Sequence, residues 1–509
     1  MPLAFAPDLD ADQPGNIQAA SGIRPTLRGY APFATLAQYN GSSGWGALTT
    51  APNNMWGHHW SVNGRIIASS TTKLYELSLT STGTFTVTDV SVGAGSYTAP
   101  SYTGTDDEQD PLPWCFASVG DVIYASNKFT STMQKQSAKA AAFTSVTSSP
   151  CCSCMVAFKN FLFIGNTGTY GGVTGTRDMV AWSGIGNTDV WVPSQATQAG
   201  YQRLLDVPGR IVALKPMGEY LAIYKQNAIW FARYDGTPVI WTFNLVEQNI
   251  GVNSDYRFPP PLVDIGNNTH VFVGAEDIYA FNGSGEPQSI TIGTVRRYLR
   301  QNYFDQAAGR MPGTRISHDV QTGDIIFWSY GLVYNHWFKK WGALPTGEIA
   351  VPIASCESNL PGIGGGAPGV INDPGYLIAK SDKRIYNRYN YSFDATARTF
   401  EPMNIQCEGG NNGQATTLLR VIPKFSVVPA GTCTLSYYRR AAYGGTAVAD
   451  STFTWDATNY RFDGVRNAYW HRTDISIVSS ASTSELSDVE YSVTAAGKRV
   501  EFPLIGSRG

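Results

Sequence analysis

The chain has 509 residues and a formal net charge of −2 at pH 7, with 15% charged residues, 12% aromatic residues and 52 glycines. Charged residues usually make up ~25% of a soluble domain, whereas many aromatic residues and glycines are typical of twisted β-sheets joined by turns, so the composition predicts an all-β protein. The nearly neutral charge gives no electrostatic reason to expect a surface that binds the phosphates of nucleic acid.

The N-terminal segment is polar and irregular. The stretch "MPLAFAPDLDADQPG", from Met1, has neither the basic start nor the apolar run of a secretion signal. No run of about 18 apolar residues occurs in the sequence. We therefore expect a soluble protein that is made in a cytoplasm and has no membrane contact, with residues 1–30 as an extended arm. Its seven cysteines, an odd number, are expected to be reduced thiols.

A hairpin pattern recurs along residues 31–400. Each copy has an apolar triplet, a short polar turn and an apolar or aromatic pair. The copies are "RIIASSTTKLYELSL" from Arg65, "DVIYASNKFTSTMQKQS" from Asp121, "FLFIGN" from Phe161, "LAIYKQNAIWFARYDGTPVIW" from Leu221, "VFVGAEDIYAFNGSGEPQSI" from Val271, "DIIFWSYGLVYNHWFKKW" from Asp324 and "YLIAKSDKRIYNRYN" from Tyr376. Their triplets begin near residues 65, 121, 162, 221, 271, 325 and 376, at a mean spacing of roughly 52 residues, which is typical of β-propeller blades.

Each hairpin would supply the two middle strands of a four-stranded antiparallel blade, so the sequence predicts a β-propeller of about seven blades. Five aromatic residues are then expected at equivalent positions: Tyr75, Trp230, Tyr279, Tyr334 and Tyr386. The hairpins near Arg65 and Asp121 are weak, which leaves the blade count open. Stacked β-sandwiches, in which irregular hairpins occur at similar spacings, remain the alternative.

One segment has helical periodicity. Residues 293–310 place Val295, Leu299 and Tyr303 on one apolar stripe. A solvated face is the ordinary role for the arginines of this segment, and we also consider them as candidates for a channel or subunit interface: Arg296, Arg297 and Arg300. Beyond residue 400 the hairpin pattern stops. Alternating strands such as "DVEYSVTAAGKRVEF", from Asp488, predict an additional C-terminal β-sandwich-like domain over residues 401–509.

No catalytic motif is complete. The stretch "GSSGWG", from Gly41, misses the spacing of a nucleophile elbow, and the loop at 362–369 lacks the context of a phosphate-binding loop. His58 and His59 point to opposite faces of a strand, and the "CCSC" cluster at 151–154 lacks a second ligand pair, so buried thiols are expected there. We therefore predict no metal site, no cofactor and no enzymatic activity.

Two polar stretches are the remaining candidates for catalytic or binding residues. "SHDVQTGDIIFW", from Ser317, imperfectly resembles the Ser-x-Asp-x-Gly-x-x-Trp turn of sialidase propellers, which the other repeats lack. Glycoside hydrolysis also needs two acids that flank the scissile bond. "TDDEQD", from Thr105, is expected to be a solvated surface loop. Its acids are further candidates for a channel or interface: Asp106, Asp107, Glu108 and Asp110.

Three stretches resemble the tail hub, or nozzle, proteins of short-tailed bacteriophages. They are "DIYAFNGSGEPQSITIGTVRRYL" from Asp277, "DVQTGDIIFWSYGLVYNHWFKKWGALP" from Asp319 and "NYRFDGVRNAYWHRTDISI" from Asn459. The resemblance is specific over about residues 205–345 and 460–500 and only architectural elsewhere. These motifs are structural, so the family supplies no catalytic residues.

The resemblance implies a structural virion protein of the phage tail that is assembled in the host cytoplasm. It implies a ring of identical chains, usually six, between the portal-adaptor protein and the distal fibre, spike or needle proteins of the tail. Genomic DNA would pass through the channel of this ring without sequence-specific binding. The alternative is a carbohydrate-active or host-receptor-binding β-propeller, which would be marked by polar groups that converge at one mouth of the propeller.

Overall fold

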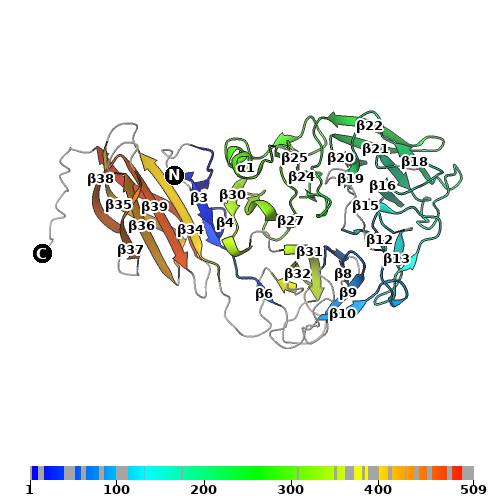
Figure 1. Ribbon diagram of the computed structural model, residues 1–509, viewed down its shortest axis with the longest axis horizontal. Coiled ribbons are helices and arrows are strands. Elements are labelled where there is room, and N and C mark those ends of the chain that lie inside the picture. Colours follow the sequence, from blue (N-terminus) through cyan, green and yellow to red (C-terminus); the bar gives the residue numbers. More distant parts are fainter. Residues whose placement is uncertain are drawn as a thin grey trace.

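The arrangement of the chain is given by a computed structural model (Figure 1). It describes residues 3–9, 16–38, 52–58, 65–79, 85–98, 113–130, 132–173, 176–306, 309–348, 352–361, 372–380, 385–387, 400–410, 415–429, 431–440, 446–455, 461–478 and 484–495. The protein is all-β, with a β-propeller beside a β-sandwich (Figure 1).

The first six blades of the propeller are rows of four antiparallel strands in chain order. Blade 1 consists of β7 (Asn54–His58), β8 (Arg65–Ser69), β9 (Leu74–Leu79) and β10 (Phe85–Asp89). Blade 2 consists of β11 (Cys115–Val119), β12 (Val122–Ser126), β13 (Gln134–Gln136) and β14 (Thr144–Ser145). Blade 3 consists of β15 (Cys152–Phe158), β16 (Phe161–Thr167), β17 (Met179–Trp182) and β18 (Gly200–Arg203). Blade 4 consists of β19 (Ile211–Met217), β20 (Tyr220–Lys225), β21 (Ala228–Gly236) and β22 (Ile240–Gln248). Blade 5 consists of β23 (Leu262–Asp264), β24 (His270–Val273), β25 (Ile278–Phe281) and β26 (Gln288–Ser289). Blade 6 consists of β27 (Ile316–Asp319), β28 (Asp324–Phe327), β29 (Leu332–Asn335) and β30 (Lys340–Ala343).

The seventh blade closes the ring with a strand from the other end of the propeller segment. Its strands are β31 (Pro352–Pro361), β32 (Asn372–Lys380), β33 (Ile385–Asn387) and β6 (Ala37–Gln38), in that order. The short strand β6 pairs Gln38 with Tyr386 and Ala37 with Asn387. Closing a propeller with strands from both ends of its chain segment leaves no broken blade, and the prediction of about seven blades is confirmed.

The first strand of each blade lies at the inside of the ring. First strands of neighbouring blades contact one another, as β31 and β7, β11 and β15, and β15 and β19 do. All seven apolar triplets used as markers in the sequence fall on second strands, from β8 to β32. The predicted hairpins are therefore the second and third strands of the blades, as expected.

Four of the five aromatic residues expected at equivalent positions occupy them. Tyr75, Trp230, Tyr279 and Tyr386 each form the second residue pair after the turn that joins the second and third strands, for example opposite Ala68 in the case of Tyr75. The prediction for Tyr334 is wrong, since it forms the third pair, opposite Ile325. Val333 takes the equivalent position because the turn in this blade, which contains a 3-10 helix at Trp328–Tyr330, closes on Leu332.

The one α-helix, among the residues that the structure describes, is α1 (Arg296–Tyr303) between blades 5 and 6. Val295 and Leu299 are buried in the core and Tyr303 packs against it, as the apolar stripe predicts, although the helix is shorter than the periodic segment. Its N-terminus is capped from far away in the sequence. The Asp8 carboxylate accepts hydrogen bonds from the backbone N–H groups of Arg297 (2.5 Å) and Tyr298 (2.7 Å).

The C-terminal domain is a sandwich of two antiparallel layers that also include strands from the N-terminal segment. One layer has the order β3 (Ala19–Ser21), β34 (Met403–Gly410), β39 (Trp470–Val478), β36 (Thr432–Arg440) and β37 (Val448–Trp455). The other has the order β4 (Ile23–Pro25), β5 (Tyr30–Pro32), β40 (Glu485–Ala495), β35 (Thr416–Val427) and β38 (Phe462–Ala468). Near the chain start, β1 (Ala4–Phe5) pairs in parallel with β2 (Asn16–Ile17).

The propeller and the sandwich are continuous. Strand β4 pairs with β30 of blade 6, so that blade 6 and one sandwich layer form a nine-stranded sheet. Figure 1 shows β3 and β4, in blue, between the two domains. A single apolar core includes Ile278 and Ile325 from blades 5 and 6, Ile17 and Tyr30 from the N-terminal segment, and Ile475 from the sandwich. The segment expected to be an extended arm therefore contributes buried side chains to the junction.

Candidate functional site

The predicted arginines of α1 form contacts within the chain. Arg296 Nε lies 3.2 Å from Asp277 Oδ2, and Arg300 Nη2 lies 3.9 Å from Glu276 Oε2. Both acids belong to the turn before β25, so these pairs fasten the helix to blade 5. Both members of the Arg300–Glu276 pair are exposed, and such a pair contributes at most about 1 kcal/mol, whereas Asp277 is buried beneath the partly exposed Arg296. A role of these arginines in an interface stays a prediction.

The predicted acidic candidates fall outside the part of the chain that the structure describes. They are Asp106, Asp107, Glu108 and Asp110. The glycine-rich loop at 362–369 and His59 lie outside it as well.

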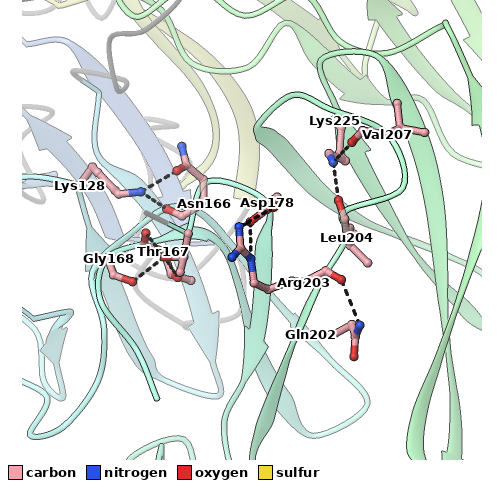
Figure 2. A network of polar contacts seen from close by, with 11 residues as sticks. Lys128, Asn166, Thr167, Gly168, Asp178, Gln202, Arg203, Leu204, Val207 and Lys225 are labelled. Atoms are coloured by element: carbon pink, nitrogen blue, oxygen red, sulfur yellow. Dashed lines mark hydrogen bonds and ion pairs between the residues drawn. The ribbon is translucent and has the colours of Figure 1, made fainter. Parts of the chain in front are cut away.

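A polar network connects blades 2, 3 and 4 on one side of the propeller (Figure 2). Arg203, at the end of β18, forms two hydrogen bonds to Asp178, with Nε to Oδ1 at 2.9 Å and Nη2 to Oδ2 at 2.8 Å. Lys128, which follows β12, donates to Asn166 Oδ1 in β16 at 2.6 Å. A two-point pair of this kind fixes the relative position of its two segments. The Arg203–Asp178 pair therefore holds β18 against the start of β17 within blade 3, and the Lys128–Asn166 bond joins blade 2 to blade 3.

The same network contains a lysine with 0% exposure, Lys225, at the end of β20. Its ammonium group donates to the backbone carbonyl oxygens of Leu204, at 2.6 Å, and Val207. Burial lowers the pKa of Lys225, whereas Asp178 and Asp206 act in the opposite direction. Both carbonyls belong to the segment that leads from blade 3 to blade 4 (Figure 2), so Lys225 anchors this connection. Its buried ammonium group is not accessible to a substrate.

A second set of polar side chains lies toward the C-terminal ends of the first strands of three blades. Lys215 of β19, Asp264 of β23 and His318 of β27 come from three successive blades, and His270 begins β24. Asp264 is exposed, Lys215 and His318 are half-buried, and His270 is buried. The charge of Asp264 acts on the other three side chains and favours their protonated forms, whereas burial lowers the pKa of each. These groups converge at one mouth of the propeller, which we call the ionisable mouth.

The hydrogen bonds of His270 identify its tautomer. Nε2 lies 3.1 Å from the carbonyl oxygen of Pro216, which can only accept, so Nε2 carries the proton. Nδ1 then accepts from the Tyr224 hydroxyl at 2.7 Å. Burial lowers the pKa of His270 to about 4. A neutral His270 therefore links blades 4 and 5, and its burial prevents contact with a ligand.

At the ionisable mouth, His318 forms a pair with His336 of the same blade. His318 Nε2 and His336 Nε2 are 3.3 Å apart, and their rings are inclined at 65°. The backbone of Asp264 favours the protonated form of His318. Burial lowers the pKa of His318 to about 4 and lowers that of His336, so both imidazoles are neutral at pH 7. Neutral imidazoles can accept protons or bind metal ions.

Sequence reasoning missed the ionisable mouth. The marker pattern located second strands, whereas Lys215, Asp264 and His318 lie in the first strands that precede them. A polar residue near the end of each first strand was the available signal. It is weak because these first strands differ in length, and only the closed ring brings their ends together.

The cysteine cluster consists of buried thiols, as expected. Cys151, Cys152 and Cys154 are free and buried, and Cys152 Sγ lies 3.9 Å from Sγ of Cys115 in the neighbouring first strand. Burial raises the pKa of Cys151 to about 11 and raises that of Cys154 well above its ordinary value. Within the described residues, no group of three or more His, Cys, Asp and Glu side chains is placed to hold a metal ion. The cluster is a packing element in this structure.

The sialidase-like stretch forms the turn between β27 and β28. Asp319 Oδ1 accepts the backbone N–H of Gln321 at 3.0 Å, and the Trp328 indole donates to Ser317 Oγ at 2.8 Å. The first bond stabilises the turn, and the second fixes the position of the Trp328 side chain. Asp319 is 2% exposed, which suits a structural role in the turn.

Comparisons with known proteins identify the fold and go no further. Neither a protein-family model nor a curated protein sequence matches the chain. Among solved structures, a streptogramin B lyase is similar over 70% of this chain and 97% of its own, with 13% identity and a TM-score of 0.40. The Pan2 WD40 domain of Neurospora crassa is similar over 72% of this chain and 98% of its own, with 8% identity and a TM-score of 0.37.

A third similar structure, the N-terminal domain of Nup159, covers 70% of this chain and 94% of its own, with 10% identity and a TM-score of 0.37. At such low identity these likenesses concern the β-propeller fold alone. No helix in the described part of the chain is long and apolar enough to cross a membrane.

Proposed function

We propose that the chain is a structural subunit of a bacteriophage tail hub, in which identical copies, six by the family resemblance, form a ring around a DNA-ejection channel. The observation that carries the proposal is where the three family-like stretches lie. They cover β25 to the start of α1, β28 to β30, and β38 with β39. All three contribute buried side chains to the core that joins propeller and sandwich, such as Leu299, Trp341 and Ile477.

The junction suits a subunit that bears load. A shared core and a sheet that continues from blade 6 into the sandwich make the two domains one block rather than two linked bodies. Large permanent interfaces are richer in apolar side chains than ordinary surfaces. The propeller and the sandwich both expose such side chains, which include Val192, Val239, Ile292, Trp337 and Val465.

The charge also suits a conduit. A formal net charge of −2 offers DNA no general attraction, and a strongly basic lining would bind phosphates and slow the passage of DNA. In this function the chain has no catalytic activity and no cofactor. Its partners are other copies of itself, the portal-adaptor protein and the distal tail proteins.

The second candidate is a carbohydrate-active or receptor-binding propeller. The ionisable mouth favours it, because Lys215, Asp264 and His318 supply the convergent polar chemistry expected of a ligand site. The purified protein should nevertheless show no turnover of polysaccharide, ester or phosphoester substrates. Turnover that is lost in Asp264→Asn, or on replacing Asp106, Asp107 or Glu108, would contradict the structural assignment.

The direct test is the assembly state and location of the protein. Electron microscopy of the purified chain, together with mass measurement in solution, should show a closed ring, and labelling of purified phage particles should place the protein in the tail. A charge-matched variant, Ile292→Ser, is expected to weaken ring formation if this exposed side chain lies in the interface. A stable monomer that is absent from purified particles would refute the proposal.

A further inference from the structure

Two imidazoles of blade 6 approach each other at the propeller surface. His318 belongs to β27 and His336 follows β29, so their side chains meet across the intervening strand β28. Their Nε2 atoms are 3.3 Å apart and their ring centroids 5.2 Å apart. Both side chains are half-buried, and the neighbouring Trp337 is 53% exposed, so the pair is reached from solvent.

The contact between the two rings pairs their nitrogens. Two neutral imidazoles whose Nε2 atoms are 3.3 Å apart share one proton, so one Nε2 donates and the other accepts. The backbone of Asp264 also acts on His318 and favours its protonated form. One of the two Nε2 atoms therefore already offers a lone pair toward the other ring.

We propose that His318 and His336 form a binding site for one divalent transition cation of the Zn²⁺, Ni²⁺ or Cu²⁺ class. In a tetrahedral site with metal–nitrogen distances of about 2.0–2.1 Å, two ligand nitrogens lie about 3.3 Å apart. This is the separation of the two Nε2 atoms. Transfer of the shared proton to Nδ1 of its own ring leaves both Nε2 lone pairs free for a cation, which would lie to one side of the line between the two nitrogens.

The remaining coordination positions belong to water. Among the residues that the structure describes, no third His, Cys, Asp or Glu side chain completes a metal-binding group. Two imidazoles favour cations of intermediate softness over Mg²⁺ or Ca²⁺, which prefer oxygen ligands. The affinity should be greatest for Cu²⁺, as the usual order of divalent metals predicts.

The test uses the full-length protein after treatment with a chelator and dialysis. Calorimetric titration with CuCl₂, NiCl₂ and ZnCl₂ should show one cation bound per chain, and MgCl₂ should give no binding heat. The superhyperfine structure in the electron paramagnetic resonance spectrum of the Cu²⁺ complex should report two nitrogen ligands. Failure of the wild-type protein to bind any of the three transition cations would overturn the proposal.

Two variants assign the site. His336→Gln keeps an amide donor for His318 but removes one ligand, and His318→Ala removes the other. Each should lose at least about tenfold in Cu²⁺ affinity, and the Cu²⁺ spectrum should lose one nitrogen ligand. The matched control is the double variant His58→Ala, His59→Ala, which removes another pair of histidines and should bind as the wild type does. Loss of binding in this control, or unchanged binding in both site variants, would refute the assignment. If a site variant does not fold, the control and the wild-type spectrum still decide between the two pairs.

Discussion

At the scale of single residues, His270 shows how burial selects a protonation state. Its ring is 0% exposed and both nitrogens are engaged, with the Tyr224 hydroxyl and the Pro216 carbonyl. A second proton would break the bond from Tyr224 and place a charge in the core. Asp264 favours that charge and Lys215 opposes it, but burial is the larger effect and lowers the pKa of His270 to about 4.

This residue predicts a loss of stability in acid. Because its pKa in the folded state lies below the unfolded value of about 6.5, the unfolded chain binds more protons between these values, and stability rises with pH. Between pH 7.5 and 4.5 His270 should account for a loss of about 2 to 3 kcal/mol in the free energy of unfolding. Denaturant unfolding of the wild type and His270→Gln at both pH values measures the difference, and equal pH slopes for the two proteins would contradict it.

A second prediction at this scale concerns an aromatic residue of the repeat. Trp230 is 5% exposed and packs in the core shared by blades 3 and 4. Trp230→Ala should lower the free energy of unfolding by ~3 to 5 kcal/mol through lost burial and the cavity left behind. Trp337→Ala, at a tryptophan that is 53% exposed, is the matched control and should cost less than about 1 kcal/mol. Similar losses in the two variants would show that Trp230 is not a core residue.

At the scale of elements, α1 depends on a cap supplied by the other end of the chain. Val295, at the N-cap position, forms no side-chain hydrogen bond to the helix. The Asp8 carboxylate replaces it by accepting from the N–H groups of Arg297 and Tyr298. A carboxylate at this position also interacts favourably with the positive end of the helix dipole.

Removing the cap should therefore loosen the helix. Asp8→Ala should reduce the free energy of unfolding by about 1 kcal/mol, with faster hydrogen exchange at the amides of Arg297 and Tyr298. Asp8→Asn keeps a hydrogen-bond acceptor without the charge, so its free energy of unfolding should lie between those of the wild type and Asp8→Ala. Exchange rates in Asp8→Ala that match the wild type would show that solvent caps the helix equally well.

At the scale of the whole molecule, the predicted boundary at residue 401 does not divide the core. Met403, Ile405 and Ile475 of the sandwich share one cluster with Ile325 and Trp341 of blade 6. Strands of the N-terminal segment lie in both layers of the sandwich, and β6 closes blade 7. Units that share a core tend to unfold together.

We expect a single cooperative transition in calorimetry. Ile477→Ala, in the sandwich part of the core, should lower the midpoint of that one transition and cost about 2 to 5 kcal/mol. The midpoint measured by near-ultraviolet circular dichroism, which follows the tryptophans of the propeller, should decrease by the same amount. Two separate transitions, with only one moved by Ile477→Ala, would show that the domains unfold independently.

The sequence by itself determined the features that repeat locally. Apolar triplets followed by short turns located the second and third strands of all seven blades, the 3.6-residue period located α1, and alternation located strands such as β40. These patterns arise because each strand or helix must bury one face, which leaves a period in the chain itself. Tyr334 was misplaced because the spacing of aromatic residues did not reveal the position at which the turn of blade 6 closes.

Only the tertiary structure decided what lies together across the chain. Strand β6 has two residues and no period, yet it completes the seventh blade by pairing with β33. The approach of His318 to His336 follows from two hairpin turns of blade 6, and the ionisable mouth gathers side chains from successive first strands. The continuity of blade 6 with the sandwich depends on β4 and β5, which are three residues each. Such contacts join residues far apart in sequence, and they leave no periodic pattern because each is fixed by the packing of the ring rather than by the burial of a local face.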